Sequence, residues 1–107
     1  MSADYSKWLV VSDIDGTLNN KLRKLPKANK AKIKEYVDNG GYFTLCSGRN
    51  LQSLTPHYKK LGIETPALFL NGAGIYDFKT NKMLSFTGVS EKAEQAILSC
   101  AELVKQA

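Results

Sequence analysis

Short apolar runs alternate along the chain with longer stretches in which apolar residues recur at helical spacing. The apolar runs cover residues 8–11, 42–46 and 67–70. Runs of this length that are nearly all apolar are typical of buried strands, so each predicts one strand of a parallel sheet. Helical spacing in residues 27–39 and 51–61 predicts a helix after each of the first two strands. This alternation indicates an α/β fold with right-handed crossovers.

The second half of the chain predicts a β-hairpin and one last helix. Residues 75–78 and 83–86 are apolar pieces on either side of a polar turn that contains Asn81, which is typical of a hairpin. Ser90 suits the N-cap of the last helix. The apolar residues of this helix keep to one face: Ala93, Ala96, Ile97, Cys100, Leu103 and Val104. Pro56 falls inside the second predicted helix, which indicates a late start or an irregular first part.

Length and composition fit one small domain with a core. The chain has 107 residues, of which 43% are hydrophobic. No apolar run approaches the roughly 18 residues that cross a bilayer, and the first residues lack the basic start and apolar core of a signal peptide. We therefore expect a cytoplasmic protein without a membrane partner. Cys46 and Cys100 lack metal-ligand spacing, so we expect both to be reduced and mostly buried.

Basic residues are concentrated after the first predicted strand. The net charge is +5, and 7 of the 15 basic residues lie close together: Lys21, Arg23, Lys24, Lys27, Lys30, Lys32 and Lys34. Such a cluster attracts phosphates or nucleic acid. No aromatic residues that stack on bases lie among these side chains. We therefore interpret the cluster as the solvated surface of a loop and a helix, and we expect no nucleic-acid partner.

Polar residues directly follow each of the three predicted strands. Asp13 and Asp15 follow the first strand, residues 47–49 follow the second, and Asn71 follows the third. Ligands of parallel sheets collect at the carboxyl ends of the strands, so these groups predict one composite site. Two neighbouring carboxylates suit a hard cation such as Mg²⁺. One of them could also act as a nucleophile while the other transfers protons.

The remaining groups suit an anionic phosphoryl oxygen. Gly16 and Thr17 supply backbone N–H groups in a tight turn, and Ser47 adds a hydroxyl. Gly48 permits close backbone approach, and Arg49 offers a planar cation. Together these groups predict phosphoryl transfer, which depends mostly on positioning and charge neutralisation. Taken alone, each motif is more typical of ordinary turn chemistry than of a site.

Taken in order, the three motifs resemble the signatures of a known superfamily. Asp-Ile-Asp-Gly-Thr-Leu at residues 13–18 and Ser-Gly-Arg at residues 47–49 are similar to the first two signatures of the haloacid dehalogenase (HAD) superfamily. Asn-Gly-Ala-Gly-Ile-Tyr-Asp at residues 71–77 is similar to a phrase of its Cof-type phosphatase branch. The resemblance implies a partial Rossmann-like, HAD-type parallel sheet with flanking helices, a β-hairpin and the start of a cap domain.

The resemblance also implies a function and a set of site residues. The implied function is that of a magnesium-dependent phosphatase acting on a small phosphorylated metabolite, such as a sugar phosphate. Asp13 would be the nucleophile that forms an aspartyl-phosphate, and Asp15 would be the general acid/base. Both would bind Mg²⁺, Asp15 through its backbone carbonyl. The implied substrate-binding residues are Gly16, Thr17, Ser47, Gly48, Arg49 and Asn71.

Two further HAD signatures do not occur in this sequence: a downstream lysine and an acidic strand end that completes the metal shell. We therefore expect residues 1–89 to form the first part of a HAD-like core and residues 90–107 to begin an inserted cap. The first strand would then lie at an open sheet edge, which predicts self-association through that edge or through the apolar face of the last helix. The alternative hypothesis is a catalytically impaired remnant that acts only as a binding or self-association module.

Overall fold

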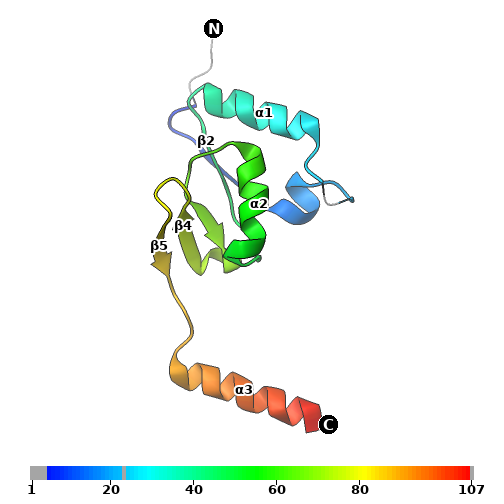
Figure 1. The fold of residues 1–107 in the computed structure, drawn as a ribbon, viewed down its shortest axis with the longest axis vertical. Coiled ribbons are helices and arrows are strands. Elements are labelled where there is room, and N and C mark those ends of the chain that lie inside the picture. The colour runs from blue at the N-terminus through cyan, green and yellow to red at the C-terminus, as the bar shows by residue number, and fades with distance from the viewer. Residues whose placement is uncertain (1–4, 23, 107) are drawn as a thin grey trace.

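A computed structural model describes residues 5–22 and 24–106, so Arg23 of the basic cluster lies outside the described residues. The elements are β1 (Leu9–Ser12), a wide turn (Ile14–Leu18), α1 (Lys27–Asp38), β2 (Tyr42–Leu45), α2 (Leu51–Leu61), β3 (Ala67–Phe69), a short 3₁₀ turn (Leu70–Gly72), β4 (Gly74–Asp77), β5 (Lys82–Phe86) and α3 (Glu91–Gln106) (Figure 1). The order of strands and helices confirms the predicted α/β fold. The third strand ends one residue earlier than predicted.

The strands form two sheets, a parallel pair on the side of the predicted site and an antiparallel three-stranded sheet beyond it. β1 and β2 run parallel, with Leu9 opposite Tyr42. One parallel bridge between Cys46 and Leu68 connects the end of β2 to β3. β4 then lies antiparallel between β3 and β5. The predicted hairpin is therefore confirmed as β4 and β5, with Asn81 at a positive φ of 54° in its turn.

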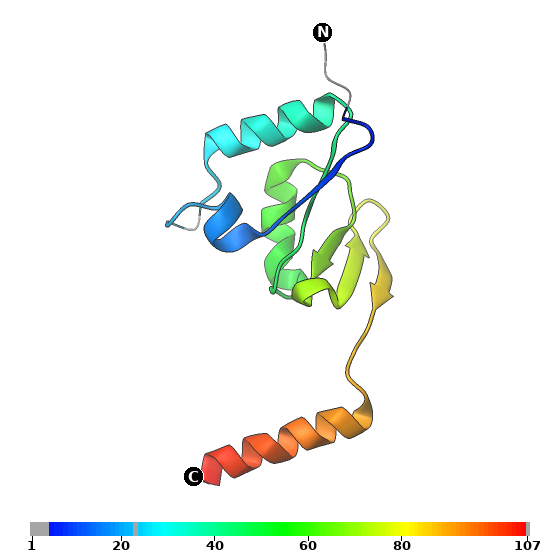
Figure 2. The same ribbon diagram turned by 180° about the vertical axis from the view of Figure 1, so that it is seen from behind.

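Both α1 and α2 cover the same face of the sheet, as the two opposite views show (Figures 1 and 2). α2 begins where the side chain of Asn50 accepts a hydrogen bond from the Ser53 N–H (2.8 Å). The helix continues without interruption through Pro56. The prediction of a late or irregular start is therefore wrong, because this cap fixes the first turn ahead of the proline.

The core lies between these two helices and the sheet. Its buried side chains are Ile14, Leu18, Ile33, Phe43, Leu45, Leu54, Tyr58, Leu61, Ile63, Ala67 and Phe69. The Tyr58 ring stacks on Phe78 with 4.0 Å between ring centroids. Ile14 and Leu18 belong to the wide turn after β1, so burial of these two side chains fixes that turn to the core.

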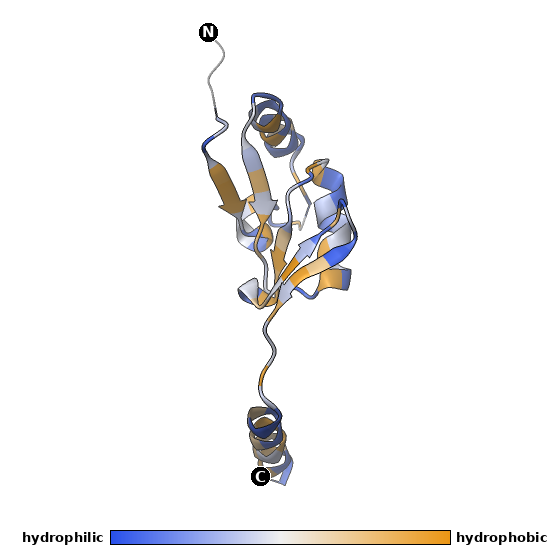
Figure 3. Cartoon of the chain, turned by 90° about the vertical axis from the view of Figure 1, so that its left-hand side faces the viewer, coloured by the Kyte–Doolittle hydropathy of each residue, from blue (hydrophilic) through white to orange (hydrophobic). Residues whose placement is uncertain are grey.

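β1 is exposed, although its apolar run predicted a buried strand. Trp8 is 67% exposed and Val10 is 42% exposed. Among the described residues only β2 pairs with β1, and Figure 3 shows the apolar strand on the outer side of that pair. The predicted open edge is therefore present. Successive side chains of a strand point to opposite faces, and Leu9, Val10 and Val11 are all exposed. The described elements therefore leave both faces of β1 largely uncovered.

α3 stands apart from the rest of the described chain, at the end of an extended segment (Figures 1 and 2). Its predicted N-cap is confirmed, since the Ser90 Oγ accepts a hydrogen bond from the Ala93 N–H (3.1 Å). None of its residues is buried. Cys100 is exposed and Cys46 is partly buried, so the prediction of a buried cysteine is wrong for Cys100. Within the described ranges, no helix has the length and apolar character that a membrane span requires.

Candidate functional site

The turn after β1 presents Asp15 to solvent. It is closed by a hydrogen bond from the Asn19 N–H to the Ile14 carbonyl oxygen (2.9 Å). Asp15 has φ −75° and ψ 124°, and Gly16 has φ 76° and ψ −2°. These are the dihedral angles of a type II turn, whose third position requires a positive φ. Gly16 therefore allows the chain to turn, while the buried Ile14 holds the turn in place.

Asp13 caps the N-terminal end of the same turn. Its carboxylate Oδ1 accepts a hydrogen bond from the Ile14 N–H (2.8 Å). The Ser12 hydroxyl donates to the Asp13 backbone carbonyl (2.8 Å). Asp13 is exposed to solvent. Its carboxylate is thus oriented by its own backbone and accessible to a ligand.

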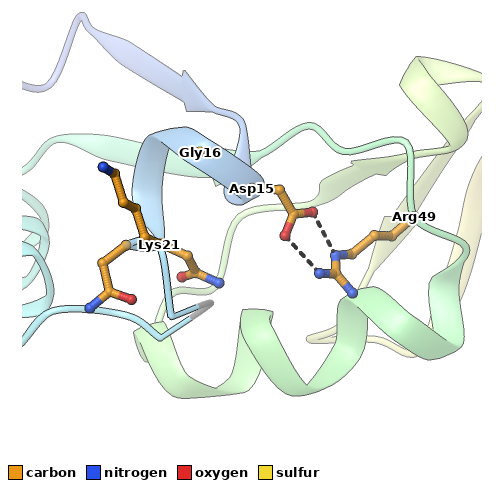
Figure 4. A pocket seen from close by; sticks show the side chains of 6 residues that line it. Asp15, Gly16, Lys21 and Arg49 are labelled. Atoms are coloured by element: carbon orange, nitrogen blue, oxygen red, sulfur yellow. Dashed lines mark hydrogen bonds and ion pairs between the residues drawn. The ribbon is translucent and has the colours of Figure 1, made fainter.

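Arg49 forms a bidentate pair with Asp15 (Figure 4). Its Nε donates to the Asp15 Oδ2 (3.0 Å) and its Nη2 donates to the Asp15 Oδ1 (2.8 Å). The hydrogen bond with Asp15 raises the pKa of Arg49 and outweighs the opposing effect of desolvation. Because the side chains are 27% and 52% exposed, the pair contributes less than about 1 kcal/mol to stability. Its main effect is to orient the Asp15 carboxylate.

The loops after β2 and β3 are joined through their backbones. The Asn71 N–H donates to the Ser47 carbonyl oxygen (2.8 Å), and the Leu70 N–H donates to the Arg49 carbonyl oxygen (3.0 Å). The buried Ser47 accepts a hydrogen bond at its Oγ from the Arg49 N–H (3.1 Å). A Cβ at Gly48 would lie 3.2 Å from the Asn71 Oδ1. A glycine at this position therefore lets the Asn71 side chain approach the loop closely.

An open pocket of about 640 Å³ lies beside the Asp15–Arg49 pair (Figure 4). Its lining residues are Asp15, Gly16, Asn19, Asn20, Lys21 and Arg49. Three predicted site residues thus border the pocket. The other five do not: Asp13, Thr17, Ser47, Gly48 and Asn71. Asp13 directly precedes the turn that carries Asp15, and Thr17 lies within that turn. The other three residues lie in the joined loops after β2 and β3.

Three residues near the pair were missed by sequence reasoning. The Ser53 Oγ accepts a hydrogen bond from the Arg49 Nη1 (2.8 Å). The Asn19 Nδ2 lies 3.5 Å from the His57 Nδ1. Burial lowers the pKa of His57, and the positive charges of Arg49 and Lys60 lower it further. The spacing of four residues between positions 49, 53 and 57 is a helical signal that could have indicated Ser53 and His57.

The acidic residues of the site offer oxygen atoms, the type of ligand that Mg²⁺ prefers. Asp13 and Asp15 are both exposed, and each offers carboxylate and backbone carbonyl oxygen atoms. Mg²⁺ sites commonly use one or two protein carboxylates and take their other ligands from water and substrate phosphate. Within the described part of the chain, no three His, Cys, Asp or Glu side chains form a metal-binding group. Water and substrate would therefore supply most ligands of a magnesium ion at this site.

The chain is an α/β protein in which the Asp15 carboxylate meets Arg49 beyond the carboxyl ends of the parallel strands β1 and β2. A family model of haloacid dehalogenase-like hydrolases matches residues 10–106. The chain belongs to this family. The family prediction from the three motifs is therefore confirmed.

Two curated relatives are named as phosphatases. The 5-amino-6-(5-phospho-D-ribitylamino)uracil phosphatase YwtE of Bacillus subtilis is 33% identical over 88 residues, which are 82% of this chain and 30% of that protein. The pyridoxal phosphate phosphatase YbhA of Escherichia coli is 26% identical over 76 residues, which are 71% of this chain and 28% of that protein. The chain spans about a third of the length of the curated relatives it matches.

Solved structures give the same family. A haloacid dehalogenase-like hydrolase from B. subtilis matches with a TM-score of 0.80 and 26% identity, over 91% of this chain and 34% of that one. A candidate HAD/COF-like hydrolase from Plasmodium vivax matches with a TM-score of 0.71 and 27% identity, over 96% of this chain and 37% of that one. The predicted fold class is confirmed by these structures.

Proposed function

We propose that the chain carries the catalytic edge of a magnesium-dependent phosphatase that hydrolyses a small phosphorylated metabolite, such as a sugar phosphate. The observation that carries the proposal is the bidentate pairing of Asp15 with Arg49, in the same turn region whose start carries the exposed Asp13. Membership of a hydrolase family supports it, as do relatives named as phosphatases of small phosphorylated molecules.

In the proposed reaction Asp13 is the nucleophile. One of its carboxylate oxygens forms a bond to phosphorus as the bond from phosphorus to the leaving oxygen breaks, and Asp15 donates a proton to that oxygen. Water then attacks the phosphorus of the aspartyl-phosphate, and the bond to Asp13 breaks. Asp15, left as a carboxylate by the first step, takes the proton from this water, so Asp13 returns to a carboxylate and Asp15 to its protonated form.

The other predicted residues bind the phosphoryl group and the substrate. We assign Ser47, Gly48 and Asn71 to this role, together with the backbone of Gly16 and Thr17. Their support is their place in the turn after β1 and in the joined loops after β2 and β3. Arg49 orients Asp15 and adds positive charge on the substrate side.

The Asp13 carboxylate and the Asp15 backbone carbonyl would hold Mg²⁺. When bound, the ion lets the anionic carboxylate and the anionic phosphate approach each other. We place the protein in the cytoplasm. The two unpaired cysteines, Cys46 and Cys100, support this location, since such thiols suit a reducing compartment.

We also propose that residues 1–89 form part of the family's core domain and residues 90–107 begin a cap domain. This division is supported by a change in side-chain burial at the extended segment before α3. The buried side chains of the core come from the chain between residues 14 and 69, whereas α3 has no buried residue.

The test of the proposed activity is magnesium-dependent hydrolysis of p-nitrophenyl phosphate. We expect Asp13→Asn to lower the rate by about 100-fold or more, since the step through the nucleophile is lost. The matched control is Asp38→Asn, because Asp38 pairs with Lys34 on α1, away from the site. The control is expected to keep the wild-type rate. Equal rates for wild type and Asp13→Asn would exclude the proposed activity for this chain.

The exposed β1 edge favours a second function, self-association with another copy of this chain. β1 presents Leu9, Val10 and Val11 to solvent, and Trp8 directly before it is also exposed. Among the described residues the outer side of β1 has no strand partner. An apolar edge of this kind is a template for strand pairing. Self-association does not require catalysis, so a catalytically impaired remnant would keep this function.

A further inference from the structure

We infer that Ser53 and His57 are positioning residues for the turn that carries Asp15. Arg49 lies just before α2, and Ser53 and His57 follow it at intervals of four residues inside the helix. Arg49 and His57 contact the Asp15 turn at two places, one at Asp15 and one at Asn19. For catalysis, this role rests on the proposed function of Asp15.

The first contact runs through Ser53. Arg49 uses Nε and Nη2 to bind both oxygens of the Asp15 carboxylate. Its remaining Nη1 donates to the Ser53 Oγ at 2.8 Å. Asn50 caps the first turn of α2 by accepting from the Ser53 N–H, so the backbone that carries the hydroxyl is held in place. Ser53 therefore sets the plane of the guanidinium group and, through it, the orientation of the Asp15 carboxylate.

The second contact runs through His57. Asn19 is only 6% exposed, and its N–H closes the turn by donating to the Ile14 carbonyl. Its side-chain Nδ2 lies 3.5 Å from the His57 Nδ1. A neutral imidazole can accept at this nitrogen, whereas a protonated one cannot. His57 therefore holds the far end of the turn while its ring is neutral.

The charges around His57 favour the neutral ring. His57 is partly buried, and Arg49 and Lys60 act against a positive charge on it, while Asp15 has a smaller opposite effect. The pKa of His57 in the folded chain is therefore below its ordinary value of 6.5. Because the unfolded chain binds the proton more readily, the contribution of His57 is complete above pH 6.5. It is lost as the pH falls through the folded-state pKa.

The experiment is amide hydrogen exchange of the whole chain, followed by NMR at the Asn19 N–H. We expect His57→Ala to lower the protection of this amide roughly fivefold, as for the loss of one net hydrogen bond. His57→Gln keeps an acceptor and is expected to retain most of the protection. In wild type the protection, corrected for intrinsic exchange, should fall below pH 6.5. In His57→Gln it should not depend on pH.

Ser53 is tested at the Arg49 Nε–H signal of the same protein. Ser53→Ala should speed the exchange of this proton several-fold, and Ser53→Thr should restore slow exchange because it keeps the hydroxyl. The control for both residues is Gln52→Ala, on an exposed side of α2. The amides of β2 report whether each variant is folded.

Unchanged exchange in His57→Ala and Ser53→Ala would overturn the inference. So would an equal loss of protection in Gln52→Ala, which would indicate a general loosening of α2. Exchange requires no turnover. A chain without phosphatase activity would therefore contradict the proposed function and leave the result on positioning intact.

Discussion

At the scale of single residues, the site depends on groups that lie far apart in sequence. The motif residues Asp13, Asp15 and Arg49 could be identified from the sequence, because each directly follows an apolar strand. The pairing of Arg49 with Asp15 could not, since it depends on how the turn after β1 faces the start of α2. Asn19 was missed for the same reason, because its burial appears only once the turn is folded.

Arg49→Lys tests whether the pair matters for geometry or for stability. Lysine cannot make two parallel hydrogen bonds to the Asp15 carboxylate. We expect kcat/KM for p-nitrophenyl phosphate to fall about 10- to 100-fold, because a small misplacement of a catalytic group has effects of this size. The free energy of unfolding in urea should change by less than about 1 kcal/mol.

The control for Arg49→Lys is Lys79→Met, which removes an exposed ion pair with Glu64 at 3.4 Å. This variant should leave both the activity and the unfolding free energy nearly unchanged. If Arg49→Lys lowers stability by several kcal/mol with no effect on kcat/KM, the pair is structural and its assignment to the site is wrong.

At the scale of elements, strands and helices could be predicted from the pattern of apolar residues, but their exposure could not. The apolar run of β1 indicates a strand, and burial on both faces requires packing partners that β1 does not have among the described residues. The apolar face of α3 is also exposed, because no described element packs against it closely enough to bury a residue. The local pattern of apolar residues therefore predicts where strands and helices form, whereas the burial of their side chains depends on which other elements pack against them.

Pro56 gives a prediction at this scale. It lies inside α2, where it has no N–H to donate to the carbonyl of Gln52, one turn earlier. Pro56→Ala should restore this hydrogen bond and raise the free energy of unfolding by about 1–3 kcal/mol. Part of the gain is offset because the unfolded chain becomes more flexible. Urea unfolding followed by Trp8 fluorescence or circular dichroism measures it, and a destabilised variant would contradict the prediction.

At the scale of the whole molecule, the described chain is elongated, with extents of 63 × 31 × 20 Å. α3 extends this shape because it lies beyond the extended segment (Figure 1). Apolar side chains are exposed both on β1 and on α3, including Trp8 and Val104 at 67% and 74%. Exposed apolar patches of this kind mark interaction surfaces.

Light scattering at increasing protein concentration tests self-association through β1. We expect the mass to exceed that of a monomer, and Val10→Lys should shift the chain toward monomer because a charged side chain on an edge strand opposes pairing. Val89→Lys is the matched control, since Val89 is an exposed apolar residue outside the strands. A wild-type monomer at high concentration, or equal effects of the two variants, would contradict association through this edge.

The most direct test of the central claim is to trap the aspartyl-phosphate. The chain is incubated with Mg²⁺ and a small phosphoryl donor such as acetyl phosphate, quenched in acid, and its peptides are analysed by mass spectrometry. We expect a phosphoryl group on Asp13 in wild type that is absent in Asp13→Asn and after removal of Mg²⁺ with EDTA. A wild-type chain without label on Asp13, or with label at another residue only, would contradict this claim.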